Sequence, residues 1–241
     1  LADGGRGGGD RVVELHLREC GPCLERYDLQ AALNRAEEIW KKWGHPIGLT
    51  RVPLIRGYAA FNTGNWKEAA EFLTHASELA KAVPELRGQR VNALSLLATA
   101  SRNLDDKAAS AKTLLLAVDE QRQVVKETND AVLHLTQSKL LADLETQYGG
   151  ALASMGRHVE AGEWYVRAEK LRDENYRVER ASIEKNIAET TVMFHAKIEA
   201  TKDAELRKIL AQSLTTYIDG KLSYLDFQAT ARDDLAENAR I

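Results

Sequence analysis

RGYAAFNTGNWKEAAEFLTHASELA, residues Arg56 to Ala80, is the stretch that decides the fold. Its pattern is typical of two short amphipathic helices folded back on each other, because Gly64 and Asn65 separate two segments with helical apolar spacing. Aromatic and leucine side chains surround a set of small residues, which would let the two helix backbones approach closely. These small residues are Gly57, Ala60, Ala69 and Ala76. The stretch therefore predicts a helical hairpin whose small residues serve packing and not chemistry.

The spacing of the small residues recurs along the chain. Gly57, Gly64, Ala69 and Ala76 stand at intervals of seven, five and seven residues. A second copy has Gly149, Gly156, Ala161 and Ala168 at the same intervals, and a degenerate third has Ala98, Asp105, Ser110 and Ala117. This pattern resembles the tetratricopeptide repeat, a helix-turn-helix unit of about 34 residues. The resemblance implies antiparallel helix pairs stacked as a right-handed α-solenoid.

Composition supports an all-α chain. Hydrophobic residues make up 44% of the 241 residues, only four prolines occur, and long runs are rich in good helix formers. Equivalent positions lie 41 residues apart from Gly57 to Ala98 and 51 apart from Ala98 to Gly149, so we expect long helices. The predicted helices cover residues 24–43, 49–62, 66–82, 86–103, 107–127, 130–155, 159–173, 178–200, 204–218 and 224–237.

Three regions are predicted along the chain. Residues 1–23 combine a glycine-rich end with a possible zinc-finger remnant, residues 24–201 form the repeat array, and residues 202–241 form capping helices. Repeat arrays need atypical ends, because the last hydrophobic face must be covered.

The charge and hydropathy of the chain indicate which classes of partner it is expected to bind. The net charge is −3 and basic residues are interspersed with acidic ones, which argues against direct nucleic-acid binding. No apolar run reaches the roughly 20 residues that span a bilayer, and no signal peptide is visible. We therefore expect a cytoplasmic protein that does not insert into a membrane.

In tetratricopeptide proteins, the first helices of successive repeats line a concave groove for a peptide or a helix of a protein partner. Carried over to this sequence, the resemblance implies a set of groove residues on two of the predicted helices. They are Arg51, Tyr58, Phe61 and Asn62 on the first, and Asn92, Ser95, Thr99, Arg102 and Asn103 on the second. The last clear copy would add Asp143, Thr146, Gly150, Ala153 and Ser154. Leu54 and Phe61 have an alternative role in packing against neighbouring helices.

The amino-terminal region holds a candidate metal motif. His16, Cys20 and Cys23 form His-x3-Cys-x2-Cys, and two thiolates at that spacing can hold one tetrahedral zinc ion together with a nearby histidine. The string around them resembles zinc-binding anti-sigma factors, through Glu14, Leu17, Leu24, Glu25 and Tyr27 as well. In that family, oxidation of the thiols can release zinc and a sigma factor. No cysteine or histidine precedes His16 in this sequence, so the fourth ligand would be Asp3, Asp10 or Glu14, a water, or a residue upstream of the given sequence.

The same residues are also compatible with thiol-disulfide exchange. Cys20-Gly-Pro-Cys23 is also the active-site sequence of thioredoxins, but helical patterns follow it where a thioredoxin needs a central sheet. The isolated histidines form no zincin motif, and neither a phosphate-binding loop nor a nucleophile elbow occurs. We therefore expect a non-enzymatic interaction scaffold, with no cofactor unless zinc is bound. The alternatives are an anti-sigma-like regulator and a thiol oxidoreductase.

Overall fold

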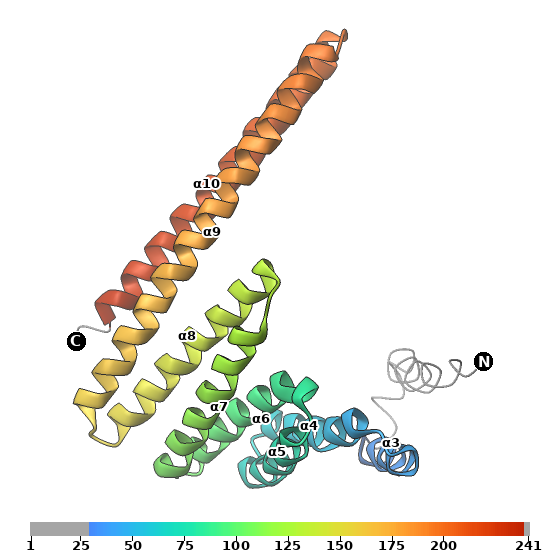
Figure 1. Ribbon diagram of the computed structural model, residues 1–241, viewed down its shortest axis with the longest axis vertical. Coiled ribbons are helices and arrows are strands. Elements are labelled where there is room, and N and C mark those ends of the chain that lie inside the picture. The colour runs from blue at the N-terminus through green and yellow to red at the C-terminus, as the bar shows by residue number, and fades with distance from the viewer. Residues whose placement is uncertain (1–28, 239–241) are drawn as a thin grey trace. The chain divides into compact units, whose positions relative to one another are not determined.

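The computed structural model describes residues 29–238, and all regular structure among them is helical (Figure 1). The all-α prediction is therefore confirmed. The described residues form α3 (Leu29–Trp43), α4 (Pro46–Asn62), α5 (Trp66–Lys81), the 3-10 helix η1 (Pro84–Leu86), α6 (Arg87–Asn103), α7 (Lys107–Glu127), α8 (Ala131–Ser154), α9 (His158–Ala200) and α10 (Ala204–Asn238). They divide into two compact units, one ending at Glu120 and the other beginning at Gln121.

A tight turn joins α3 to α4. Gly44 has a φ of +60°, which a glycine adopts without steric cost, and the turn ends α3 where the sequence predicted. The predicted start of α4 at residue 49 was three residues late. His45 caps the helix by accepting a hydrogen bond from the Gly48 amide at Nδ1 (3.1 Å), and Pro46 occupies the first turn, where its missing amide hydrogen costs nothing.

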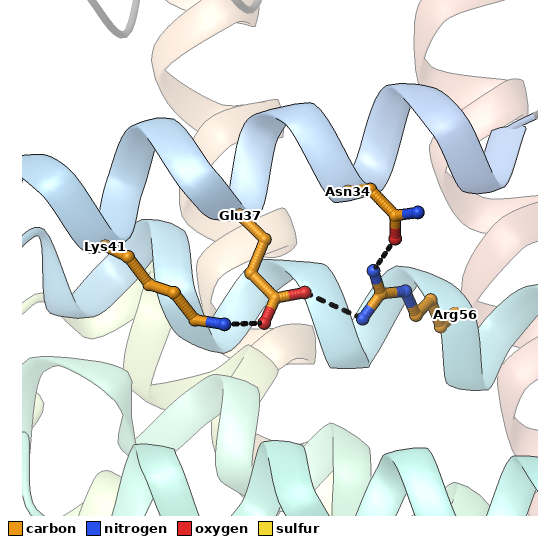
Figure 2. A network of polar contacts seen from close by, with 4 residues as sticks. All are labelled: Asn34, Glu37, Lys41 and Arg56. Atoms are coloured by element: carbon orange, nitrogen blue, oxygen red, sulfur yellow. Dashed lines mark hydrogen bonds and ion pairs between the residues drawn. The ribbon is translucent and has the colours of Figure 1, made fainter.

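Polar contacts also tie α3 to α4 (Figure 2). Arg56 on α4 donates to Glu37 Oε2 (2.9 Å) and to Asn34 Oδ1 (2.6 Å) on α3. Lys41, one turn after Glu37, pairs with its other oxygen at 2.6 Å. The network fixes the register of the two helices, and the buried Leu33, Trp40 and Val52 form the apolar contact beside it.

The hairpin predicted from residues 56–80 is formed by α4 and α5. A Cβ at Gly57 would lie 2.7 Å from Leu73 Cγ, so only glycine permits this approach of the two helices. Leu73, Ala69 and Ala76 are fully buried and share one core with alanines of α6. Burial of a side chain such as Leu73 contributes about 1.5–3 kcal/mol.

The repeated small-residue positions have the same structural roles in all three hairpins, α4–α5, α6–α7 and α8–α9. The two positions after each turn are buried: Ala69 and Ala76, Ser110 and Ala117, Ala161 and Ala168. The turns themselves use left-handed backbone at Gly64 (φ +74°), Asp105 (φ +61°) and Gly156 (φ +78°). The degenerate middle copy is therefore a genuine structural equivalent of the other two.

In the second unit, α8 and α9 pack closely because Gly149 lies under the ring of Tyr165, where a Cβ would come within 2.7 Å of Cε1. Tyr148 meets Trp164 edge-on, with ring centroids 4.8 Å apart. The 43 residues of α9 form one helix, so the predicted division into 159–173 and 178–200 was wrong. No glycine or proline lies between residues 173 and 178 to stop the helix.

The helix α10 returns along α9 as a long antiparallel hairpin (Figure 1). The predicted break at Asp219-Gly220 was wrong, because α10 continues through both residues. A glycine inside a helix costs about 1 kcal/mol relative to alanine. Leu214 and Leu225, on either side of it, are both buried, and their burial outweighs that cost.

Two predicted helix starts are confirmed at the hydrogen-bond level. Asp130 Oδ1 accepts from the Leu133 amide (2.8 Å) at the start of α8, and Asp203 Oδ1 accepts from the Leu206 amide (2.9 Å) at the start of α10. Each carboxylate satisfies an amide that the first helical turn leaves unpaired. The two aspartates therefore cap the starts of α8 and α10.

Candidate partner-binding face on helices α4 and α6

The predicted groove residues lie on two helices of equal length in the first unit. Helices α4 and α6 each have 17 residues, their starts are 41 residues apart, and they contact each other beside α5. Arg51, Tyr58 and Asn62 of α4 are exposed, and their equivalents on α6 are Asn92, Thr99 and Asn103. We call the set Arg51, Tyr58, Asn62, Asn92, Ser95, Thr99, Arg102 and Asn103 the α4–α6 face.

Several polar groups of this face are available to a partner. In the first unit as the structure describes it, no hydrogen bond or ion pair engages the side chains of Arg51, Asn62 or Arg102. The Tyr58 ring is 37% exposed, and its hydroxyl is likewise without a protein partner among the described residues. Guanidinium, amide and phenol groups of this kind bind peptide backbone and carboxylates.

Part of the face is organised by local hydrogen bonds. Thr99 Oγ1 donates to the Ser95 carbonyl (3.2 Å), and both side chains are half-buried. Asn103 Nδ2 donates to the Thr99 carbonyl (2.9 Å), which leaves its Oδ1 facing outward as an acceptor. These bonds hold the last turn of α6 in one conformation, so little entropy would be lost when a partner binds there.

Phe61 has a packing role as well as its place near the face. Its ring meets the Trp66 ring edge-on at a centroid distance of 5.1 Å, and it packs against the core between α4, α5 and α6. The side chain is half-buried, and Leu54, at 9% exposure, belongs to the same core. The exposed aromatic surface of the face is therefore that of Tyr58.

Asp143 and Thr146, two of the candidates from the third copy, lie in the second unit. Arg172 of α9 donates from Nη2 to Asp143 Oδ1 (3.1 Å) and to Thr146 Oγ1 (2.8 Å). These side chains therefore serve the α8–α9 hairpin, unlike Arg102 of the α4–α6 face.

The candidate metal ligands His16, Cys20 and Cys23 lie outside the described residues. Among residues 31–230, whose side chains the structure describes, no group of three or more histidine, cysteine, aspartate or glutamate side chains is arranged to hold a metal ion. None of the described helices combines the length and apolarity needed to cross a membrane.

A concave surface that the sequence did not indicate lies entirely within the second unit. It encloses about 680 Å³ between the start of α8, the middle of α9 and the middle of α10. Its α10 wall includes Thr216, Gly220 and Tyr224 at helical spacing. These residues form a continuous stripe along α10. The predicted helix break at Gly220 divided the stripe, so the sequence pattern that could have indicated this surface was missed.

Comparisons of the chain with protein-family models and with curated proteins found no match.

Proposed function

We propose that this chain is a non-enzymatic interaction module whose α4–α6 face binds an extended segment or a helix of a partner protein. The observation that carries the proposal is that Arg51, Tyr58, Asn62 and Arg102 are exposed on α4 and α6 and that their polar side-chain groups have no hydrogen-bond or ion-pair partner among the described residues. Arg102 supplies a cation, Asn62 and Asn103 supply amides, and Tyr58 supplies an amphipathic ring. Arginine and tyrosine are enriched where interfaces bind most strongly.

The resemblance to tetratricopeptide repeats supports the same function. The three hairpins repeat the small-residue positions of that family and the left-handed turn between paired helices. In the family, first helices of successive repeats present the binding residues, and α4 and α6 would be such helices here. We therefore assign the chain to a tetratricopeptide-like scaffold acting in the cytoplasm, without a catalytic reaction.

Capture of partners by the whole chain tests the proposal. The native chain and an Arg102→Ala/Asn103→Ala variant would be used as baits in extract of the source cells, with bound proteins quantified by mass spectrometry. We expect at least one protein to be retained by the native chain and reduced about tenfold on the variant, because Arg102 contacts the partner directly.

A matched variant on another helix controls for general surface effects. Glu71 and His75 are exposed on α5 and belong to no interaction among the described residues, so Glu71→Ala/His75→Ala should leave capture unchanged. Equal retention by all three baits, with normal helicity by circular dichroism, would reject the α4–α6 face.

The amino-terminal motif favours one further candidate function. His16, Cys20 and Cys23 have a spacing that can hold zinc, and the segment around them resembles anti-sigma factors, in which oxidation of the thiols can release zinc and a sigma factor. By this resemblance the chain would be a zinc- or thiol-dependent regulator that binds a sigma factor. Protein purified under reducing conditions should then carry about one zinc ion, and Cys20→Ser should remove it. Zinc far below one per chain, unaltered by Cys20→Ser, rejects this candidate. Reduction of insulin disulfides dependent on Cys20 would instead indicate the oxidoreductase.

A further inference from the structure

Helices α8 and α10 pack along α9 and leave a slot between them at the start of α8. Both helices contact α9. In the described part of the second unit, α10 packs mainly against α9 and not against α8. The floor of the slot is formed by Val178, Glu179, Ser182 and Ile183 of α9. One wall is Ala131, Val132 and Leu135 of α8, and the other is Thr216, Tyr217, Gly220, Lys221 and Tyr224 of α10. We call this surface the α8–α10 slot.

The one acidic group in the slot is already neutralised within the protein. Lys139 of α8 donates to Glu179 Oε2 (2.7 Å), and the Tyr224 hydroxyl donates to Glu179 Oε1 (2.9 Å). Both oxygens of the carboxylate are thus engaged from the two walls. Partial burial and this hydrogen bond also raise the pKa of Tyr224 above its usual value. A ligand therefore meets little net charge from Glu179.

Lys221, the cation of the slot, has no opposite charge paired with it among the described residues, in contrast to Glu179. The Lys221 ammonium lies 5.8 Å from the centroid of the Tyr217 ring, and no carboxylate of the described residues pairs with it. Lys221 is half-buried as a residue, and a partly desolvated ammonium attracts an anion more strongly than a fully hydrated one. The slot is therefore complementary to one negative charge beside an apolar surface.

Two apolar residues that line the slot, one in its α8 wall and one in its floor, are exposed. Val132 is 77% exposed and Val178 is 57% exposed. A small ligand would leave both side chains in water, whereas a helix laid along α9 would cover them. Gly220 favours the second occupant, because no atom lies within 4 Å of the position its Cβ would take, and another helix backbone can approach there.

We propose that the α8–α10 slot binds an amphipathic helix of a partner protein that carries an aspartate or glutamate beside its apolar stripe. The helix completes a four-helix arrangement with α8, α9 and α10, and its carboxylate pairs with Lys221. Its apolar residues, spaced by three and four, contact Val132, Val178 and Tyr224. This site is independent of the α4–α6 face, because every residue of it belongs to the second unit.

A display selection on the full chain tests the proposal. The probe is a library of 20-residue peptides with leucine fixed at helical spacing and all other positions randomised. Enriched peptides should share an acidic residue flanking the leucine stripe, and fluorescence anisotropy of labelled peptides gives their Kd. Gly220→Leu, which fills the slot, should weaken binding about tenfold or more. Gly162→Leu on α9, where a Cβ also meets no atom within 4 Å, should leave the Kd unchanged.

A charge exchange identifies the contact with Lys221. Lys221→Glu should weaken the peptide about tenfold, and replacing the acidic residue of the peptide by lysine should restore most of the loss. Failure of the library to yield a helical binder contradicts the proposal, as does a selected peptide that binds Gly220→Leu with the native Kd. Concentration-dependent dimerisation of the chain that Gly220→Leu abolishes would assign the slot to a second copy and overturn the proposal as well.

Discussion

Asp105 and Gly64 occupy the same turn position in consecutive hairpins, 41 residues apart, and both have left-handed backbone, with φ angles of +61° and +74°. Glycine adopts this conformation readily, whereas an aspartate pays a steric cost. The turn at Asp105 has the same backbone geometry as the turn at Gly64, although its residue is an aspartate and not a glycine. The middle hairpin therefore carries local strain that its neighbours do not.

Asp105→Gly is accordingly expected to stabilise the chain. Relief of the left-handed strain should exceed the extra entropy of an unfolded glycine, for a net gain of about 0.5 kcal/mol in the free energy of unfolding. Gly64→Ala should instead lower it by about 1 kcal/mol, because alanine is strained at the same φ. Urea denaturation followed by circular dichroism measures both. A loss of stability in Asp105→Gly as large as that in Gly64→Ala would contradict the equivalence of the two turns.

Two glycine-to-alanine substitutions in the second unit should have opposite signs. At Gly149 the new Cβ would lie 2.7 Å from Tyr165 Cε1 and 3.3 Å from the Ala161 carbonyl, so α8 and α9 must separate, at a cost of about 1–3 kcal/mol. At Gly162 it would meet no atom within 4 Å, and the better helix propensity of alanine should contribute about 0.5–1 kcal/mol. Thermal unfolding distinguishes them. Equal effects would mean that the close approach at Gly149 does not hold α8 against α9.

Arg122 should stabilise the second unit more than an exposed arginine does. Its Nη2 donates to Glu145 (2.7 Å), a residue only 4% exposed, and its guanidinium lies 5.1 Å from the Trp164 ring centroid. Arg122→Met leaves the carboxylate buried without this partner, and we expect a loss of about 2 kcal/mol. Arg180→Met breaks the exposed pair with Glu184 and should cost much less than Arg122→Met. Similar losses in the two variants would contradict the role of burial.

The contacts of Glu37 predict a pH dependence. The hydrogen bond from Lys41, followed by the smaller influence of Arg56, lowers the pKa of Glu37 below its usual 4.5 in the folded protein, against an opposing effect of partial burial. The ionised side chain therefore stabilises the fold above the pKa of the unfolded state, and this contribution is lost as pH falls through the lower folded pKa.

Glu37→Gln should consequently be less stable than the native chain at neutral pH, by about 0.5 kcal/mol. The difference should shrink as the pH is lowered below 4.5, which urea denaturation at several pH values measures. Glu38→Gln, at an exposed neighbour without these partners, should match the native chain throughout. A gap for Glu37→Gln that does not change with pH would contradict the assigned interaction.

The parts of the fold that the sequence predicted well depend on steric necessity. A position such as Gly57 or Gly149 admits no side chain, so its spacing reveals which helices pack together. The errors occurred where tertiary packing outweighed a local preference. Gly220 lies within α10 because leucines on both sides of it are buried against α9, and no local pattern reports that burial.

The residues of the α4–α6 face were named from the sequence, whereas the α8–α10 slot was not. The resemblance to tetratricopeptide repeats selected Tyr58, Asn62 and Arg102, and these residues are exposed, while their role in binding stays a prediction. The α8–α10 slot was not predicted, because it depends on how three helices from separate parts of the sequence meet. Periodicity indicates the face of a helix, but the partners of Glu179 are fixed only by the packing of α8 and α10 around α9.

The central claim is that Arg102 and its neighbours on α4 and α6 bind a protein partner. Isothermal titration of the partner recovered by capture tests it most directly, with the native chain, Arg102→Ala/Asn103→Ala and the control Glu71→Ala/His75→Ala. We expect the first variant to bind about tenfold or more weakly, with unchanged helicity, and the control to keep the native Kd. Native affinity in the Arg102→Ala/Asn103→Ala variant would contradict the claim.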